Sequence, residues 1–547
     1  MLLGTRFTCL ADNTVDYWMK EKENLTDEII KSKLSTLEWH DSSKLQIYIH
    51  VPFCTQKCTF CAFSGGNYFS FDLIDDYISN ILKQLSDTLK ITRTYNKEIK
   101  SINIGGGSPD ILSSSIERLL DSITTLPVYT KKTDISIEFS LYSISDEFMN
   151  AIDKFDITKV SFGVQTLQPD IRKSLRMPEK LRKMDEICER LSRKIPIVNV
   201  DLMTGLPGQT LNSALHDVMF FISHPHINSI SSYVFSQGSA PAFIADILSH
   251  KVPEPPSQET HASIRLHTYT LLLKNGWNRY GTCTYLDKKK ISQDQLEKIA
   301  GNECLGAHAY EDYLIGVGSS AISYFPGLRL ENISDYNQWM SAINRGALPY
   351  NLDKSSIDDQ LDMALWGFPL QFRGLSHSNF IKMKERQIIT EKQLKTFNEY
   401  IEEGLIHLNN NNTYELTITG EIFMGHLVKK LKKEEDQKTI DNYINEGRKI
   451  GELIASGKIK KTHNINNRQL DLLKKENPYD ITRFNSYLLR DHFYRVNPAR
   501  TINGSGPESG KQLWNRGRKS FSMGKCHGLG HSGTHILFRS IPNRSGH

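Results

Sequence analysis

The sequence has 547 residues, of which 39% are hydrophobic and 24% charged, a composition typical of a globular protein with two or three domains. The net charge of +5 is too small to predict nucleic-acid binding, and no apolar run approaches the roughly 20 residues that cross a bilayer. The first residues lack a basic stretch followed by an apolar one, so we expect no signal peptide, no membrane partner and a cytoplasmic location.

From Leu45 onward, short runs rich in Ile and Val alternate with longer amphipathic segments. Repeated strand-then-helix units predict a parallel sheet with right-handed crossovers, and six or more of them favour an α/β fold, a partial or full (β/α) barrel. The predicted strands are Leu45–Val51, Ser101–Ile104, Ile135–Phe139, Lys159–Val164, Val198–Met203 and Ser229–Phe235, and the predicted helices include Asp72–Leu89, Ser113–Thr124, Leu211–Ser223 and Glu259–Lys274, which precedes the segment Trp277–Thr282.

A second, smaller region begins near Ser355. Its amphipathic segments predict helices, and an Asn-rich turn between two short runs predicts a hairpin. We therefore expect a small winged-helix-like α+β domain, although a generic α+β cap fits the pattern equally well. The helices are predicted at Ile357–Leu365, Ser376–Lys384, Glu391–Glu403 and Thr419–Lys432, and the hairpin at Leu405–Leu408 and Tyr414–Thr417 around the turn Asn409–Asn412.

These patterns predict five segments. Residues 1–44 form an N-terminal extension without a recognisable motif, 45–350 the barrel, 355–432 the small C-terminal domain, and 433–496 a charged helical extension. Residues 497–547 are rich in Gly and Ser and hold eight basic residues against one acid, Glu508, which predicts a flexible basic tail. Nucleic acid is not expected as a partner.

Three of the eight cysteines follow the first predicted strand, in the spacing Cys54-x3-Cys58-x2-Cys61. Loops at the carboxyl ends of barrel strands carry the chemistry, and three thiolates can bind one face of a [4Fe–4S] cluster. Because Phe63 occupies the next plausible ligand position, one iron would stay open, and S-adenosylmethionine (SAM) could chelate it. A structural zinc site with His50 as fourth ligand, or a redox C-x-x-C pair, are the alternatives.

The scattered positions of the other cysteines, Cys9, Cys188, Cys283, Cys304 and Cys526, do not suggest a disulfide framework. This pattern fits a reducing compartment, where an oxygen-sensitive cluster would persist.

Residues 47–63, IYIHVPFCTQKCTFCAF, resemble the radical SAM motif of the oxygen-independent coproporphyrinogen III oxidase-like family. Matching segments follow in the same order at 105–109, 137–139, 161–165, 201–210, 312–318 and 335–336. The resemblance covers about residues 45–432. It implies a radical SAM barrel, a three-cysteine cluster that cleaves SAM to a 5′-deoxyadenosyl radical, and a flavodoxin- or ferredoxin-type electron donor.

The resemblance also implies which residues contact SAM, although an ordinary polar network at the barrel rim would use the same residue types. The positions that match contacts to the cluster-bound SAM are Tyr48, Gly106, Gly107, Ser108 and Glu138. The positions that match contacts to a second SAM are Phe60, Gln165, Arg176 and Asp201, with Arg172 as an alternative to Arg176.

Two departures from the family bear on the reaction. Phe63 stands where the oxidases carry a fourth cysteine, and residues 303–310 lack the HNxxYW haem-binding motif of the chaperone branch. The sequence therefore favours carbon methylation or related radical chemistry, with a second SAM, on a tetrapyrrole-like or other conjugated small molecule. An oxygen-independent coproporphyrinogen III oxidase, working by oxidative decarboxylation, and a non-catalytic haem chaperone are the alternatives.

Overall fold

The computed structural model describes most of the chain up to residue 458. The described residues are 25–41, 43–56, 58–61, 71–178, 181, 183–235, 241–280, 283–292, 295, 312–352, 355–357, 370, 374–385, 387–432, 434, 437 and 448–458. The chain divides into two compact units, 1–494 and 495–547, and every described residue belongs to the first. The predicted extension and basic tail therefore lie almost wholly outside the described residues.

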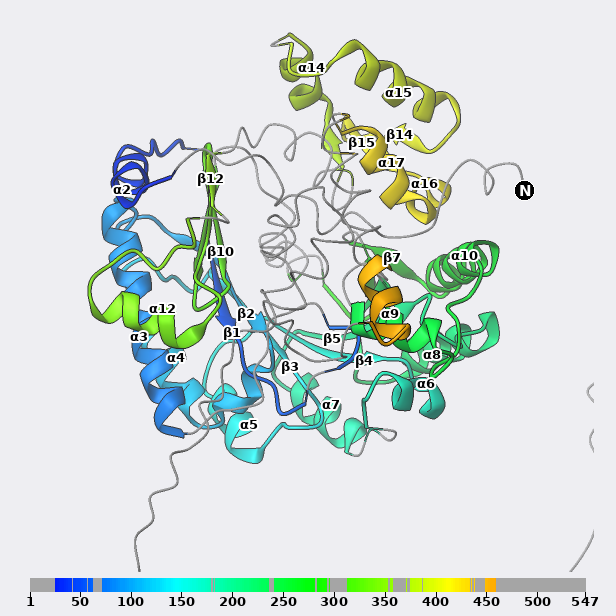
Figure 1. Ribbon diagram of the computed structural model, residues 1–547, viewed down its shortest axis with the longest axis horizontal. Coiled ribbons are helices and arrows are strands. Elements are labelled where there is room, and N and C mark those ends of the chain that lie inside the picture. The colour runs from blue at the N-terminus through cyan, green and yellow to red at the C-terminus, as the bar shows by residue number, and fades with distance from the viewer. Residues whose placement is uncertain are drawn as a thin grey trace, which may run out of the picture. The chain divides into compact units, whose positions relative to one another are not determined.

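A single curved sheet of twelve strands is the centre of the described residues (Figure 1). Its strand order is β12-β11-β10-β9-β1-β2-β3-β4-β5-β6-β8-β7. The strands are β1 Leu45–Val51, β2 Ile99–Gly106, β3 Asp134–Phe139, β4 Lys159–Gln165, β5 Ile197–Thr204, β6 Ser229–Val234, β7 Trp277–Arg279, β8 Thr284–Asp287, β9 Tyr313–Val317, β10 Ile322–Phe325, β11 Leu328–Glu331 and β12 Ser356–Ile357.

The strand directions make this sheet a partial barrel. Strands β9 and β1 to β6 are joined by parallel ladders. Antiparallel strands extend both ends, with β10, β11 and β12 beyond β9 and with β8 and β7 beyond β6. The α/β barrel predicted from the sequence is confirmed in its partial form, and the six predicted strands correspond to β1 to β6.

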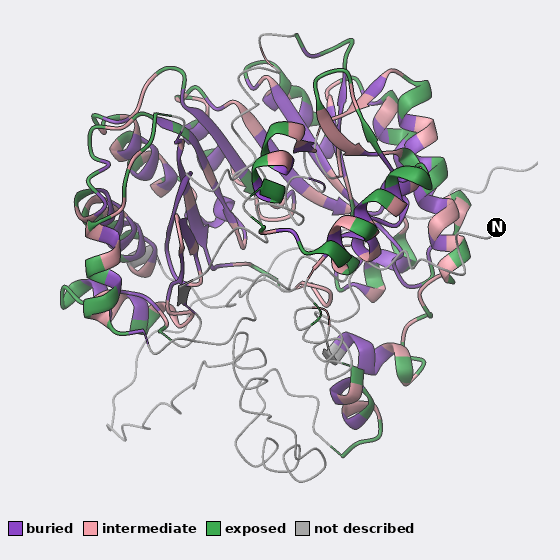
Figure 2. Cartoon of the chain, turned by 90° about the horizontal axis from the view of Figure 1, so that it is seen from above, coloured by how far each residue is buried: buried purple, intermediate pink, exposed green. Residues whose placement is uncertain are grey.

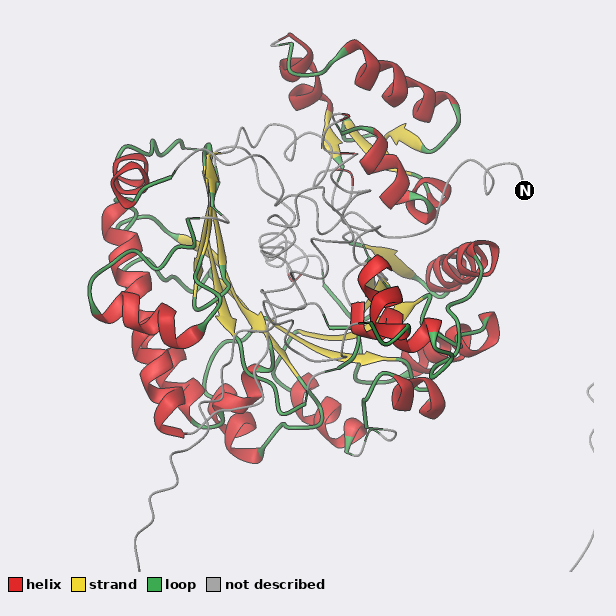
Figure 3. Cartoon of the chain, in the orientation of Figure 1, coloured by secondary structure: helices red, strands yellow, loops and turns green. Residues whose placement is uncertain are grey.

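Helices cover the convex face of the sheet (Figures 1 and 3). In α4, for example, the buried residues recur at the three- and four-residue spacing of an amphipathic helix, and Figure 2 shows exposed residues on the outer side of the helices. The helices of this part are α2 Asp27–Ser35, α3 Phe71–Ile91, η2 Pro109–Leu112, α4 Ser115–Thr124, α5 Asp146–Ile152, α6 Pro169–Ser174, α7 Met184–Ser192, α8 Leu211–Ser223, α9 Pro241–Leu248, α10 Gln258–Lys274 and α12 Tyr336–Asn344.

The two faces of the sheet differ in chemistry because side chains alternate along a strand. In β1, Leu45, Ile47, Ile49 and Val51 belong to the main hydrophobic core. The residues between them turn polar or aromatic side chains to the concave face, and the same alternation runs through β2 to β6. The side chains on this polar face include Gln46, Tyr48, His50, Ser101, Asn103, Asp134, Ser136, Glu138, Lys159, Ser161, Asn199, Asp201, Ser229, Ser231 and Tyr233.

A small α+β domain follows the sheet, as the sequence predicts. Its three-stranded sheet has the order β13-β15-β14, and Phe380, Phe397 and Tyr414 pack together in its core. The elements are β13 Leu375–Ser376, α14 His377–Glu385, α15 Glu391–Glu402, β14 Ile406–Leu408, β15 Thr413–Leu416, α16 Ile418–Ile422 and α17 Met424–Lys430.

The prediction of one helix over Thr419–Lys432 is wrong, because the chain breaks at Phe423 into α16 and α17. The side chain of Arg265, from α10, donates to the carbonyl oxygens of Glu421 and Ile422 at 2.5 and 2.6 Å. Those carbonyls would otherwise accept bonds within a continuous helix.

The predicted start of the helix Ile357–Leu365 is wrong, because Ile357 lies in the strand β12. Residues 358–365 lie outside the described residues. In residues 1–44, which carried no recognisable motif, the structure has α2, capped by Thr26 and buried through Ile30 and Leu34. None of the described helices has the length and apolar composition to cross a membrane.

Gln84 on α3 joins three parts of the barrel through a buried network. Its Oε1 accepts from the amide of Gly318 at 3.0 Å, from Trp339 Nε1 at 3.1 Å and from Asn332 Nδ2 at 3.2 Å. Its Nε2 donates to Asn332 Oδ1 at 3.0 Å. The network therefore fixes the chain after β9, next to β1, against the helix layer.

We predict that Gln84→Leu lowers the free energy of unfolding by about 3 kcal/mol, because it leaves the buried donors of Gly318 and Trp339 without their acceptor and Asn332 Oδ1 without its donor. Thermal and urea unfolding would measure the loss. Asp87→Asn, at an exposed position of the same helix, is the control and should leave the transition unchanged. Equal transitions for wild type and Gln84→Leu would show that the network contributes nothing.

Candidate functional site

The cysteine loop begins where β1 ends, and backbone hydrogen bonds fix it to the end of β2. The amide of Gly107 donates to the carbonyl of Val51 at 2.7 Å, and the amide of Ser108 donates to that of Phe53, also at 2.7 Å. A Cβ on Gly107 would collide with the same two carbonyl oxygens. The glycine is therefore required for the close approach of two strand ends.

The other half of the loop contacts the turn that follows α6. The amide of Thr59 donates to the carbonyl of Leu175 at 3.1 Å, and Gln56 Nε2 donates to the carbonyl of Arg176 at 2.6 Å. Phe60 and Cys58 pack against the apolar side chains of this turn, Leu175 among them. The loop is thus held from two directions, by β2 on one side and by α6 on the other.

Cys54, Cys58 and Cys61 are all partly buried and belong to no disulfide. Burial, followed by the charge of Cys61, raises the pKa of the Cys58 thiol to about 12, and Arg172 acts in the opposite direction. Such a thiol becomes a thiolate when a metal replaces its proton. No set of three or more His, Cys, Asp and Glu side chains in the described residues meets closely enough to hold a single metal ion.

A [4Fe–4S] cluster does not require such a meeting point, because each thiolate binds a different iron. The same observation gives the single-zinc alternative no support among the described residues. His50, its suggested fourth ligand, has its Nδ1 2.9 Å from the hydroxyl of Tyr48.

Backbone and aromatic groups border the concave face next to the loop. Gly106 has a φ of +106°, which favours glycine, and a Cβ there would collide with the ring of His50. The hydroxyl of Ser108 donates to the carboxylate of Asp110. Of the predicted site residues, Tyr48, Gly106, Gly107 and Ser108 therefore lie together, where β1 and β2 end beside the cysteines.

The predicted carboxylates Glu138 and Asp201 both face the concave side. Glu138 is accessible there, and Asn103 Nδ2 donates to its Oε1 at 3.3 Å. Because this side chain faces the concavity of the barrel and not bulk water, its pKa is raised, and Asn103 and then Lys159 oppose this effect. A carboxylate in this setting favours a cationic or hydroxyl-bearing ligand.

Asp201 accepts from Ser161 Oγ at 2.9 Å and from Asn199 Nδ2 at 2.7 Å. Removal from water, followed by the charge of Glu138, raises its pKa to about 7, while Lys159 acts against both. The two carboxylates and the lysine therefore form one electrostatically coupled group across β3, β4 and β5.

The remaining predicted residues lie at the end of β4 and beyond it. Gln165 ends the strand with a φ of +66°, an uncommon conformation for a residue with a Cβ. Arg176 is exposed, with a φ of +56°. The alternative, Arg172, is buried, and each nitrogen of its guanidinium already donates to a backbone carbonyl or to Tyr142.

Sequence reasoning missed several residues of the polar face, although the signal was present. Asn103, Lys159, Ser161 and Asn199 occupy every second position of correctly predicted strands, in step with Glu138 and Asp201. Applying the two-residue period to each strand would have assigned them to the concave face. Tyr142 gave no comparable signal, and Arg172 was named only as an alternative SAM contact, because hydrogen bonds from a side chain to backbone carbonyls leave no residue pattern in the sequence.

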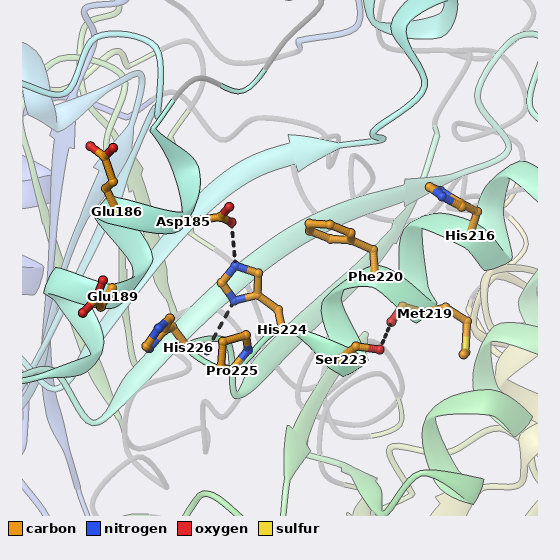
Figure 4. Close-up of a pocket in the computed structure, with 10 residues that line it drawn as sticks. All are labelled: Asp185, Glu186, Glu189, His216, Met219, Phe220, Ser223, His224, Pro225 and His226. Atoms are coloured by element: carbon orange, nitrogen blue, oxygen red, sulfur yellow. Dashed lines mark hydrogen bonds and ion pairs between the residues drawn. The ribbon is translucent and has the colours of Figure 1, made fainter. Parts of the chain in front are cut away.

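A pocket of about 730 Å³ lies on the opposite side of the sheet, between α7 and α8 (Figure 4). Its histidines are engaged locally: His224 Nε2 lies 3.1 Å from Asp185 Oδ1, and the amide of His226 donates to His224 Nδ1 at 3.3 Å. Removal from water lowers the pKa of His224 below its ordinary value, and Asp185 opposes the effect. The pocket lies on the helix-covered face, whereas the cysteine loop and the carboxylates share the concave one.

Comparisons with known proteins bear on the family and the fold. The model of the radical SAM superfamily matches residues 48–221. The chain is 26% identical over 384 residues to the heme chaperone HemW of Bacillus subtilis, covering 69% of this chain and 96% of that one. It is 24% identical over 445 residues to the oxygen-independent coproporphyrinogen III oxidase of Helicobacter pylori strain J99, covering 78% and 93%.

Among solved structures, coproporphyrinogen III oxidase (HemN) from Escherichia coli superimposes with a TM-score of 0.63 at 15% identity, covering 79% of this chain and 98% of that chain. At this identity the likeness concerns the fold, and it includes the partial barrel.

The raised pKa of Asp201 predicts a pH-dependent effect of Asp201→Asn. The carboxyl has a pKa near 3.9 when unfolded and about 7 when folded, so its protonated form favours folding, and this contribution is lost as the pH rises toward 7. The variant cannot ionise. Its melting temperature relative to wild type should therefore increase between pH 5 and pH 8.

Asp76→Asn, which removes an exposed carboxylate of α3, is the matched control and should show a flat difference over the same range. A flat difference for Asp201→Asn as well would mean that the barrel leaves this carboxyl unperturbed.

Proposed function

Because the chain belongs to the oxygen-independent coproporphyrinogen III oxidase-like family of the radical SAM superfamily, we propose that it binds a [4Fe–4S] cluster and SAM at the carboxyl ends of β1 and β2. We further propose that it acts on a tetrapyrrole. The observation that carries the proposal is the position of the three cysteines. They lie in a loop that is pinned beside Gly106 and Gly107 and that borders a polar concave face.

Each part of the site has a proposed role. Cys54, Cys58 and Cys61 hold three irons of the cluster, and the fourth iron is left for the amino and carboxylate groups of SAM. When bound, the cluster supplies the electron that cleaves SAM to methionine and a 5′-deoxyadenosyl radical. The protein's own contribution is to fix the cysteines and to exclude competing ligands.

The strand ends receive SAM in this proposal. Gly106 and Gly107 let the backbone approach the methionine part without a Cβ in the way, and Ser108 adds a hydroxyl. Glu138 accepts hydrogen bonds from the amino group or ribose of SAM, which compensates a carboxylate that desolvation otherwise disfavours. Tyr48, oriented by His50, contacts the same ligand.

A second SAM is a finer proposal, carried by Phe60, Gln165, Arg176 and Asp201. Gln165 ends β4 and Asp201 lies within the neighbouring strand β5, and Phe60 belongs to the cysteine loop. Arg176 would have to turn inward from its exposed position to meet a carboxylate. One SAM at the cluster is therefore the core of the proposal, and the second site depends on that movement.

The proposed substrate class comes from the relatives, which are named for haem and for coproporphyrinogen. Neither name supports carbon methylation, the reaction favoured by the sequence, so it stays an alternative that depends on the second SAM. Oxidative decarboxylation and haem delivery are the other two, and Phe63 and residues 303–310, which bear on them, lie outside the described residues. For the catalytic reactions we propose a flavodoxin- or ferredoxin-type donor as the source of electrons.

We predict that the anaerobically reconstituted protein forms 5′-deoxyadenosine from SAM and dithionite, and that Cys58→Ala reduces the yield to background because the cluster loses a ligand. Liquid chromatography would quantify the product. Cys188→Ala, which removes a cysteine in the core away from the loop, should retain the yield of wild type.

Two candidate substrates, haem and coproporphyrinogen, then separate the three reactions. S-adenosylhomocysteine formed with haem present would select methyl transfer, and CO₂ released from coproporphyrinogen would select the oxidase. Stoichiometric haem binding by a fully loaded protein that forms no 5′-deoxyadenosine would contradict the catalytic proposal and leave haem delivery.

A further inference from the structure

Arg172 is a buried cation beside the cysteine loop. Its side chain is inaccessible to solvent, and each of its three nitrogens donates to a neutral acceptor. Nε donates to the carbonyl of Pro178 at 2.6 Å, and Nη1 to those of Val164 and Thr166 at 2.7 and 2.8 Å. Nη2 donates to the hydroxyl of Tyr142 at 2.6 Å.

Within the described residues, no carboxylate forms an ion pair with this guanidinium. Asp217, which is linked to it through Thr166, accepts instead from the side chains of Thr166 and Gln168. Hydrogen bonds to carbonyls satisfy the N–H groups, but they leave a full positive charge in a low-dielectric interior. Such a charge is costly unless an opposite charge lies close by.

The position of Arg172 shows where that opposite charge would lie. The guanidinium stacks over the ring of Tyr142, 5.5 Å from its centroid, and Tyr142 packs in the same apolar cluster as Cys58. Leu175, the residue that follows α6, accepts through its carbonyl a hydrogen bond from the amide of Thr59. Arg172 therefore lies directly behind the part of the loop that carries Cys58.

A purely structural role explains the hydrogen bonds of Arg172, which connect the end of β4 to α6. It does not explain why this position carries a charged side chain. A neutral amide could satisfy part of the same carbonyls without the desolvation penalty. A [4Fe–4S] cluster with three thiolates carries a net negative charge, which grows by one unit on reduction.

We infer that Arg172 is the built-in counter-charge of the cluster, a positioning residue that stabilises its reduced state from behind Cys58. This inference rests on the proposed function. Its consequence is that the cation raises the reduction potential of the cluster, because it interacts more favourably with the more negative state. Electron transfer to the cluster, and from it to SAM, is thereby adjusted by a residue that contacts neither.

The test is the midpoint potential of the reconstituted cluster, measured by dye-mediated titration with electron paramagnetic resonance detection. Arg172→Gln keeps amide donors and removes the charge. We expect its equilibrium constant for reduction to fall about tenfold, which corresponds to about 59 mV for one electron. Arg172→Lys keeps the charge and loses the hydrogen bonds of the guanidinium, and its potential should stay near that of wild type.

Arg193→Gln is the matched control, since it removes an arginine that is 71% exposed and pairs with Glu189, and it should leave the potential unchanged. A full cluster at the wild-type potential in Arg172→Gln would overturn the inference while leaving the proposed function intact. If Arg172→Gln does not fold, a tenfold loss in Arg172→Lys would overturn it equally. A wild-type protein that forms no cluster would overturn both.

Discussion

The short backbone hydrogen bonds between the ends of β1 and β2 are the contacts on which the candidate site depends. Gly107 and Ser108 bind the carbonyls of Val51 and Phe53 at 2.7 Å, so the chain leaves β1 along one path and delivers the first cysteine at the barrel rim. The turn after α6 then holds Thr59. Without both contacts, the three cysteines would lie in a flexible loop, and their thiols would not be held in the positions that a cluster needs.

The same strands serve the core and the site through their two faces. Outward residues such as Ile47 and Ile137 pack under the helices, while the alternate positions carry hydroxyl, amide and carboxylate groups. Buried polar groups are tolerable where they bond to one another, as on β4 and β5: Asn199 Nδ2 donates to both Ser161 and Asp201 at 2.7 Å. The raised pKa of Asp201 is the residual cost, and a cationic ligand would remove it.

Much of this was predictable from local pattern. The bounds of β1 and α8 agree with the sequence prediction residue for residue, because an alternating or amphipathic run between turn-forming residues has one favourable solution. The break at Phe423 was not predictable, since it depends on Arg265, which is distant in the sequence. The surroundings of Arg172 were missed for the same reason: its partners are backbone carbonyls, which no residue pattern encodes.

The central claim is that three cysteines leave one iron open for SAM. The most direct measurement is the electron paramagnetic resonance spectrum of the dithionite-reduced cluster before and after addition of SAM. The account predicts a [4Fe–4S] signal whose g values shift when SAM binds the open iron. A reduced cluster whose spectrum is unaffected by excess SAM, or a reconstituted protein that holds zinc instead, would contradict it.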